Sequence, residues 1–339
     1  MNGFQRINAA LEGQMPDARP VMLHNFMMAA REAGWTMAEF REDPRKIASS
    51  FIRAVETYEY DGIVVDIDTA TLAGAVGVPV AFPQDQPARA HGLYLKRLED
   101  AKRLDPVEIG GYRYVRNWLD AVGRIKDCFG DEIFIRGNCD QAPFALASMM
   151  RTPQLWMVDL LEDEDNALAL LEYCTDVTCQ FIRLMAGTGC HMVSNGDSPA
   201  GPEMISPQMY RRFALPYEKR VVDEAHRLGL PYALHICGNT DAILRDMRAT
   251  GADAFELDHK TDLGKAFSSF GDAACMIGNI DPCGVLAHGT TADVVRATQR
   301  VLDVYAGSPR LILNAGCAIP AETPPQNLRA LIAAARHPA

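Results

Sequence analysis

Short apolar runs alternate with segments of helical periodicity along the whole chain. Polar residues or glycine follow each run, and the segments between the runs carry apolar residues at every third or fourth position. Short apolar strands that alternate with helices are typical of a parallel sheet covered by helices. The pattern predicts eight strands, at residues 21–24, 63–65, 133–135, 191–194, 231–234, 254–258, 275–277 and 310–313.

Eight strand–helix units in a chain of 339 residues fit a closed (β/α)8 barrel, the TIM-barrel fold. We therefore predict an α/β protein with a single TIM-barrel domain over residues 1–339, to which a short helix at 4–12 adds an N-terminal extension. The segment 77–92, rich in proline and alanine, is predicted to be a loop. The helix between residues 206 and 229 should kink at Pro216. Further helices are predicted at about 44–58, 94–104, 111–129, 142–150, 152–161, 165–186 and after residue 324.

The composition narrows the class of partner and the compartment. Apolar residues make up 48% of the chain, which is enough for a large core, and the formal net charge of −11 argues against nucleic acid or an anionic membrane as the main partner. No apolar run approaches the length of a membrane span, and the first residues lack the apolar core of a signal peptide. Nine cysteines in a chain without an export signal predict reduced thiols in the cytoplasm rather than a disulfide framework.

Polar side chains collect where the predicted strands end. Enzymes with this fold place their active sites at the carboxyl ends of the barrel strands. We therefore expect these side chains to share one mouth of the barrel. They are His24, Asp66, Asp68, Asn138, Asn195, Asp197, His235, Cys237, Glu256, Asp258, Asn279, Asp281, Asn314 and Cys317.

Three of these residues form a candidate metal site. His235 and Cys237 are two apart at the end of a predicted strand, so their side chains point to the same face. Cys317 follows the last predicted strand, and a closed barrel brings it to the same mouth. One imidazole and two thiolates are a ligand set for zinc with an open position. The alternative for His235 and Cys237 alone is a core histidine beside a buried thiol.

Motifs across nearly the whole chain resemble the uroporphyrinogen decarboxylase superfamily. The motifs that carry the likeness are Ser206-Pro207, Phe213-Ala214-Leu215-Pro216-Tyr217, His235-Ile236-Cys237-Gly238-Asn239, Gly251-Ala252-Asp253-Ala254, Gly278-Asn279-Ile280-Asp281-Pro282, and Gly316-Cys317 with Pro324-Pro325-Gln326-Asn327-Leu328. The spacing from Asp68 to Gly77 and the run Pro79-Val80-Ala81-Phe82-Pro83 match it in the N-terminal half.

Two branches of that superfamily differ in their chemistry. The decarboxylases need no metal and carry an arginine-rich signature after the first strand, whereas this chain has no arginine from His24 to Ala30. The zinc-dependent branch of corrinoid methyl transfer, which includes methylcobamide:coenzyme M methyltransferases and O-demethylase components, is similar to this chain in its His-x-Cys and distant Gly-Cys. The resemblance therefore implies a zinc methyltransferase.

The resemblance also implies partners and further site residues. A corrinoid such as methylcobalamin would be carried on a separate corrinoid-binding protein that docks on the barrel mouth. The other substrate would be a small-molecule methyl donor or a thiol, and a homodimer is left open.

Asp68 matches the family's active-site aspartate, with a loop-capping role as its alternative. Asn195 and Asp197 are candidate catalytic residues that would orient other groups. Glu256 is both a candidate catalytic residue and a candidate fourth zinc ligand, with a carboxylate bonded to a loop as the alternative.

Two thiolates cancel the charge of Zn²⁺, so the ion would polarise water poorly, while a thiol at the open position would lose its proton and stay nucleophilic. The ligand set therefore favours alkyl transfer to sulfur over hydrolysis.

Three other functions remain as alternatives to a zinc methyltransferase. They are a tetrapyrrole decarboxylase, thiol addition to an electrophile such as an epoxide, and a binding protein whose zinc only ties the barrel together.

Overall fold

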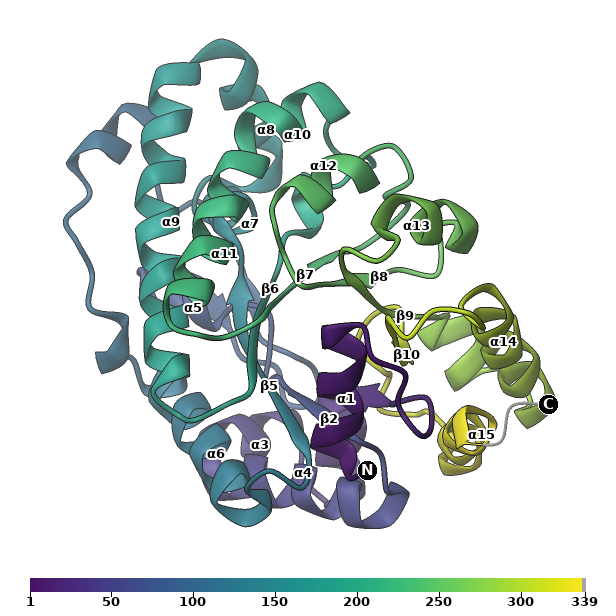
Figure 1. Cartoon of the computed structure of the whole chain (residues 1–339). Helices are drawn as coiled ribbons and strands as arrows, with labels where there is room; N and C mark the ends of the chain where they lie inside the picture. The colour runs from purple at the N-terminus through teal and green to yellow at the C-terminus, as the bar shows by residue number, and fades with distance from the viewer. Residues whose placement is uncertain (337–339) are drawn as a thin grey trace.

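Eight parallel strands form one sheet that closes into a barrel in the computed structural model, which describes residues 1–336 (Figure 1). The strands are arranged in chain order, and a bridge between Val21 and Leu313 joins the last strand to the first. The prediction of a (β/α)8 barrel is confirmed. The strands are β1 (Met22–Leu23), β2 (Gly62–Val65), β5 (Phe134–Gln141), β6 (Met192–Gly196), β7 (Tyr232–Ile236), β8 (Ala254–Leu257), β9 (Cys275–Ile280) and β10 (Leu311–Ala315).

Helices surround this barrel on its outer side, except α1, which lies across one end, as Figure 1 shows. They are α1 (Gly3–Glu12), α2 (Phe26–Glu32), α3 (Met37–Glu42), α4 (Pro44–Tyr58), α5 (Thr71–Ala75), α6 (Arg113–Phe129), α7 (Pro143–Arg151), α8 (Pro153–Glu162), α9 (Glu164–Ala186), α10 (Pro207–Phe213), α11 (Leu215–Arg227), α12 (Leu244–Ala249), α13 (Leu263–Phe270), α14 (Thr291–Val304) and α15 (Pro325–Arg336). Short 3₁₀ segments occur at η1 (Leu98–Arg103), η2 (Ile109–Gly111) and η3 (Ser198–Ala200), and a π-helical turn at η4 (Pro282–Ala287).

Three local predictions differ from the structure. The segment 77–92 is not entirely loop, because it contains a two-stranded antiparallel hairpin, β3 (Val80–Ala81) and β4 (Arg89–Ala90). The helix predicted at 94–104 is only the 3₁₀ segment η1. The helix predicted to kink at Pro216 is two helices that meet at Ala214, and Pro216 lies in the first turn of α11, where its missing N–H costs nothing.

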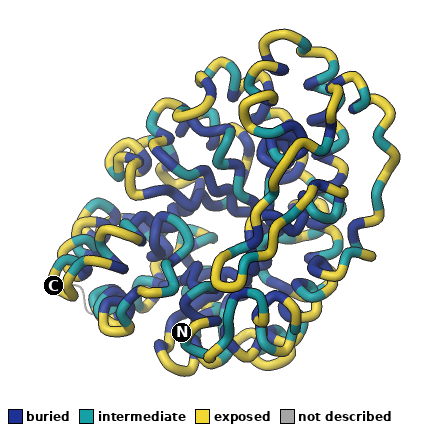
Figure 2. The backbone as a smooth tube through the Cα atoms, turned by 180° about the vertical axis from the view of Figure 1, so that it is seen from behind, coloured by how far each residue is buried: buried dark blue, intermediate teal, exposed yellow. Residues whose placement is uncertain are grey.

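The barrel has two apolar cores, one inside the ring and one between strands and helices. Figure 2 shows the buried strands at the centre and the exposed outer sides of the helices around them. Helix α1 closes the end of the barrel where the strands begin, because Ile7 packs into the inner core together with Met22 and Phe134. A Cβ on Gly62 would lie 2.5 Å from Ile7 Cδ1, so any larger residue there would push the Ile7 side chain out of its present position. Within residues 1–336, no helix has both the length and the hydropathy to cross a lipid bilayer.

Candidate metal centre at the barrel mouth

The polar ends of the strands surround a cavity of about 270 Å³ at the carboxyl end of the barrel. Its walls come from all parts of the chain, as expected when parallel strands converge on one mouth. Predicted site residues Asp68, His235, Cys237, Glu256 and Cys317 all line it. The other lining residues are His24, Phe26, Met27, Asp66, Thr69, Pro87, Arg136, Asn138, Asp140, Gln141, Gly196, Ser198 and Ala318.

His235, Cys237 and Cys317 converge on one point of this cavity. Their candidate ligand atoms all lie within 4.8 Å of one another, and this is the only such group among the described residues. His235 Nε2 is 2.9 Å from Cys237 Sγ, which is 3.6 Å from Cys317 Sγ. His235 lies in β7 and Cys237 follows the end of that strand, and the barrel brings Cys317 from 80 positions beyond Cys237.

The backbone beside His235 selects the nitrogen that faces the cluster. His235 and Glu256 are paired across β7 and β8, and His235 Nδ1 donates to the Glu256 carbonyl oxygen at 3.0 Å. This bond leaves Nε2 free to act as a ligand and holds the ring in place, an arrangement common for metal-binding histidines. Without a metal, the Cys317 thiol donates a hydrogen bond to the Cys237 sulfur. This bond and the positive charge of His235 lower the pKa of Cys237 to about 4.

The geometry of the three atoms fits a tetrahedral zinc. Two sulfurs bound to one zinc at about 2.3 Å would be roughly 3.8 Å apart, close to the 3.6 Å between Cys237 and Cys317. Nitrogen and sulfur ligands would be roughly 3.5 Å apart, so the 2.9 Å contact of His235 would open slightly. These residues therefore fit a soft divalent ion with one open position.

Glu256 lies beside the cluster, but its carboxylate is held by other partners. Glu256 Oε2 is 2.5 Å from Arg136 Nη1, and Glu256 Oε1 is 3.5 Å from His24 Nδ1. Burial alone would raise the pKa of Glu256, but the charge of Arg136 and the bond to His24 bring it well below its usual range. The carboxylate thus neutralises two buried cations, and as a fourth zinc ligand, which stays a prediction, Glu256 would have to serve the metal as well as these partners.

His24 adds a positive charge to the cavity wall. Its Nε2 lies 2.7 Å from Asp66 Oδ2, and its other nitrogen faces Glu256. Burial would lower the pKa of His24, but the hydrogen bonds with Asp66 and Glu256 outweigh burial and raise it to about 9. At neutral pH the imidazole is therefore protonated between two carboxylates.

Asp68 faces the same cavity with one oxygen that has no protein partner. Asp68 Oδ1 accepts hydrogen bonds from the amides of Ala70 and Thr71 and from the Thr71 hydroxyl, each at 2.9 Å. Asp68 Oδ2 is buried and unpaired. Burial raises the pKa of this carboxyl group. Asp68 thus combines the loop-capping role with a free oxygen that can accept a hydrogen bond from a ligand.

Asn195 and Asp197, predicted as catalytic residues, do not line the cavity. On β6, Gly196 points into it, so its two neighbours point outwards to the helices. Asn195 Nδ2 donates to the Cys139 carbonyl oxygen at 2.6 Å, and Asn195 Oδ1 accepts from the Tyr232 hydroxyl. Asp197 Oδ1 accepts from the Ala145 amide at 2.7 Å. Both side chains fasten β6 to its surroundings, and Asn195 Nδ2 also donates to the carbonyl oxygen of the cavity residue Gln141 at 3.3 Å.

Asp197 also forms a buried carboxyl pair with Glu218. Burial raises the pKa of Asp197 to about 7, with a hydrogen bond between the two carboxyl groups acting in the opposite direction. Asp197 Oδ2 and Glu218 Oε1 have no other partner, and Glu218 Oε2 accepts from the Tyr210 hydroxyl. The two groups therefore need one shared proton.

This pair makes the barrel less stable as the pH rises. Because the folded pKa of Asp197 lies above its ordinary value of 3.8, the folded protein holds a proton between about pH 4 and 7 that the unfolded chain releases. Stability is therefore lost through that window, by at most about 1.4 kcal/mol per pH unit. Glu218→Gln removes one of the two buried carboxyl groups whose pKa is raised, so it should reduce this slope. Urea unfolding of the wild type and of Glu218→Gln at pH 5 and pH 8 measures how the free energy of unfolding changes with pH. Equal changes in the two proteins would contradict the expectation.

Two charged cavity residues, Arg136 and Asp140, were not predicted from the sequence. Arg136 is a charged residue inside the apolar strand β5, and a buried arginine almost always has a carboxylate partner, which was a usable signal. Asp140 follows the end predicted for that strand. The strand runs on past a shift in register, and Asp140 has a φ of 58°, which turns it towards the cavity. No sequence pattern in this segment indicated that shift.

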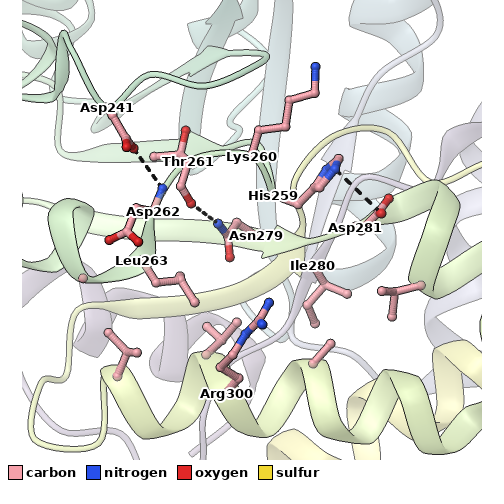
Figure 3. Close-up of a pocket in the computed structure, with 15 residues that line it drawn as sticks. Asp241, His259, Lys260, Thr261, Asp262, Leu263, Asn279, Ile280, Asp281 and Arg300 are labelled. Carbon is pink, nitrogen blue, oxygen red and sulfur yellow. Dashed lines mark hydrogen bonds and ion pairs between the residues drawn. The ribbon is translucent and has the colours of Figure 1, made fainter.

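A larger cavity of about 780 Å³ lies outside the mouth, between the loop after β8 and helix α14. Figure 3 shows it with His259 pointing towards Asp281 and Arg300 reaching up from α14. None of the predicted catalytic or metal-binding residues line it.

Fold and site together define a TIM-barrel protein with a candidate soft-metal centre at its mouth. Residues 2–338 match the family model described as uroporphyrinogen decarboxylase (URO-D), and the chain belongs to this family. The resemblance seen in the motifs is thereby confirmed.

Named relatives come from both branches of the family. The chain is 29% identical over 338 residues to the methylcobamide:CoM methyltransferase MtbA of Methanosarcina acetivorans, covering 98% of this chain and 97% of the relative. It is 27% identical over 341 residues to the uroporphyrinogen decarboxylase of Gloeobacter violaceus, covering 93% and 92%. A solved methyltransferase structure from Methanosarcina mazei superposes with a TM-score of 0.90 at 22% identity and 98% coverage of both chains, which shows the same fold.

Proposed function

We propose that this protein is a zinc-dependent methyltransferase that moves a methyl group between a small molecule and a corrinoid on a partner protein. The observation that carries the proposal is the convergence of His235, Cys237 and Cys317 on one cavity at the barrel mouth. The 29% identity to methylcobamide:CoM methyltransferases, over nearly the full length of both chains, supports the reaction class.

His235, Cys237 and Cys317 would hold the zinc, which would supply a Lewis-acid position for a thiol or for the atom that loses a methyl group; a thiol bound there would lose its proton and stay nucleophilic. The fourth position is left to water or substrate, because Glu256 is paired with Arg136 and His24. Asp68 Oδ2 would orient the bound molecule through a hydrogen bond. His24 keeps a proton at the cavity wall, between Asp66 and Glu256.

Two directions of transfer fit this site. In an acceptor-side enzyme, a thiol would take the methyl group from a methylcorrinoid. In a donor-side enzyme, a methylated small molecule would give its methyl group to cob(I)amide. The mouth of the barrel is the expected docking face for the corrinoid protein, because the cavity opens there.

Metal analysis and a cobalamin methyl-transfer assay separate this proposal from the alternative functions. Purified protein should contain about one zinc per chain, and incubation with methylcob(III)alamin and a panel of thiols should give the spectrum of cob(I)alamin with at least one of them. A donor-side enzyme would instead methylate cob(I)alamin from a methylated substrate in the reverse assay. Release of carbon dioxide from uroporphyrinogen, or thiol addition to an epoxide with no transfer to or from cobalamin, would contradict the proposal.

A further inference from the structure

One segment after β8, residues 258–261, touches both loops that carry the cysteines. The first loop is the turn 237–240, and the second is the turn 316–317 after β10. Neither Asp258 nor Thr261 lines the 270 Å³ cavity, so they act on it only through these loops. Figure 3 shows His259, Lys260 and Thr261 of this segment, with the Thr261 carbonyl oxygen accepting a hydrogen bond from Asn279.

Asp258 uses both carboxylate oxygens as acceptors for backbone amides. Asp258 Oδ2 accepts from the N–H of Gly238, the residue after Cys237, at 2.9 Å, and Oδ1 accepts from the N–H of Lys260 at 3.0 Å. Hydrogen bonds to a charged acceptor are the stronger kind. Gly238 has a φ of 86°, a conformation that disfavours other residues, so the turn takes a defined shape at this point.

Thr261 holds the same turn through its hydroxyl group. Its Oγ1 accepts from the Thr240 amide at 3.0 Å, lies 3.2 Å from the Gly238 carbonyl oxygen, and is 2.9 Å from the Thr240 hydroxyl. Thr240 and Thr261 are both fully enclosed, so any of these groups left unpaired would carry the cost of a buried polar atom.

The second cysteine loop packs directly on the same segment. A Cβ on Gly316 would lie 2.6 Å from the His259 nitrogen and 3.0 Å from the Asp258 Cα. Gly316 precedes Cys317, so the contact fixes how closely Cys317 approaches. One segment thus contacts both loops whose sulfurs lie 3.6 Å apart.

We propose that residues 258–261 are a clamp that positions Cys237 and Cys317, with Asp258 and Thr261 as its positioning residues. The clamp rests on the proposed function in one respect, because the paired sulfurs are taken to serve a metal. Loss of an outer partner of this kind typically weakens metal affinity by about 10–100-fold.

The test measures the two thiols with and without zinc. Phenylarsine oxide captures two neighbouring thiols: two As–S bonds form, the two S–H protons leave with the oxide oxygen as water, and arsenic remains trivalent. Two quantities are measured for Asp258→Asn and Thr261→Val. The first is the capture of phenylarsine oxide by the metal-free protein, and the second is the zinc affinity, obtained by competition with a chelator. In Asp258→Asn only one acceptor oxygen remains for the two amides of Gly238 and Lys260. In Thr261→Val the hydroxyl group is lost while the shape of the side chain is kept. Both readouts should weaken by about tenfold or more.

Matched variants separate the clamp from general loosening. Thr261→Ser restores the hydroxyl and should regain most of the affinity. Thr290→Val removes a hydroxyl that caps α14 and should bind like the wild type. Cys317→Ser gives the background from the other cysteines, and circular dichroism checks folding. If Asp258→Asn does not fold, the comparison of Thr261→Val with Thr261→Ser tests the clamp without it.

Unchanged arsenic capture in folded Asp258→Asn and Thr261→Val would overturn the clamp. A loss of capture that Thr290→Val reproduces, or that Thr261→Ser does not repair, would also overturn it. If wild-type protein binds no zinc, the proposed function fails, while arsenic capture still decides whether the clamp positions the sulfurs.

Discussion

Replacing Cys317 with alanine is expected to remove most of the bound zinc and to lower the rate of methyl transfer by about 10³-fold. The loss of one of three protein ligands breaks the site, and a metal contributes several kcal/mol to a reaction, at about 1.4 kcal/mol per factor of ten. The barrel should stay folded, because its two apolar cores and not the metal hold it together. Metal analysis, transfer rates and circular dichroism of the purified variant measure these three effects.

Cys128→Ala is the matched control for this experiment. Cys128 is exposed on helix α6, and its sulfur belongs to no cluster of ligand atoms within residues 1–336. Its replacement should change neither zinc content nor transfer. Full zinc occupancy in Cys317→Ala would show that the ligand set is wrong and would remove the main support for methyl transfer.

Replacing Glu256 with glutamine is expected to lower the free energy of unfolding by about 3–5 kcal/mol, because a buried ion pair loses one partner. Arg136 and Glu256 are 2% and 1% exposed, and His24 loses its second carboxylate as well. Urea unfolding of the metal-free protein measures the change. The double variant with Arg136→Met should recover part of the loss, since the unpaired buried cation is then gone.

An exposed pair provides the control for burial. Glu172 and Arg220 are also 2.5 Å apart, but their side chains are 56% and 43% exposed, so Glu172→Gln should have a much smaller effect. An equally small effect of Glu256→Gln would contradict the role assigned to the buried pair. Zinc content of Glu256→Gln also tests its part in the metal site: retention supports three protein ligands, and loss would make Glu256 the fourth.

Several features of the site follow from the sequence alone. The eight strands were located correctly, since each is a short apolar run between helical segments. His235 and Cys237 were predicted to share a face because side chains in a strand alternate with a period of two. The closed barrel then placed Cys317 beside them, because the carboxyl ends of all strands meet at one mouth.

Which face of a strand points inwards was decided only by the tertiary structure. Strand β6 is apolar on both sides, with Met192 in the inner core and Val193 in the outer core, so its sequence carries no strong preference. That choice sends Gly196 into the cavity and turns Asn195 and Asp197 away from it.

The electrostatics of the cavity also depend on contacts between distant segments. Arg136 meets Glu256 from a strand 120 positions earlier, and His24 bridges Asp66 and Glu256. A sequence shows that such residues lie at strand ends, but their separation depends on register and on the closure of the ring. The sequence by itself thus determined the fold and the thiols of the candidate metal site. Only the packed barrel determined which carboxylates are paired and which face the cavity, because pairing needs atoms within a few ångströms.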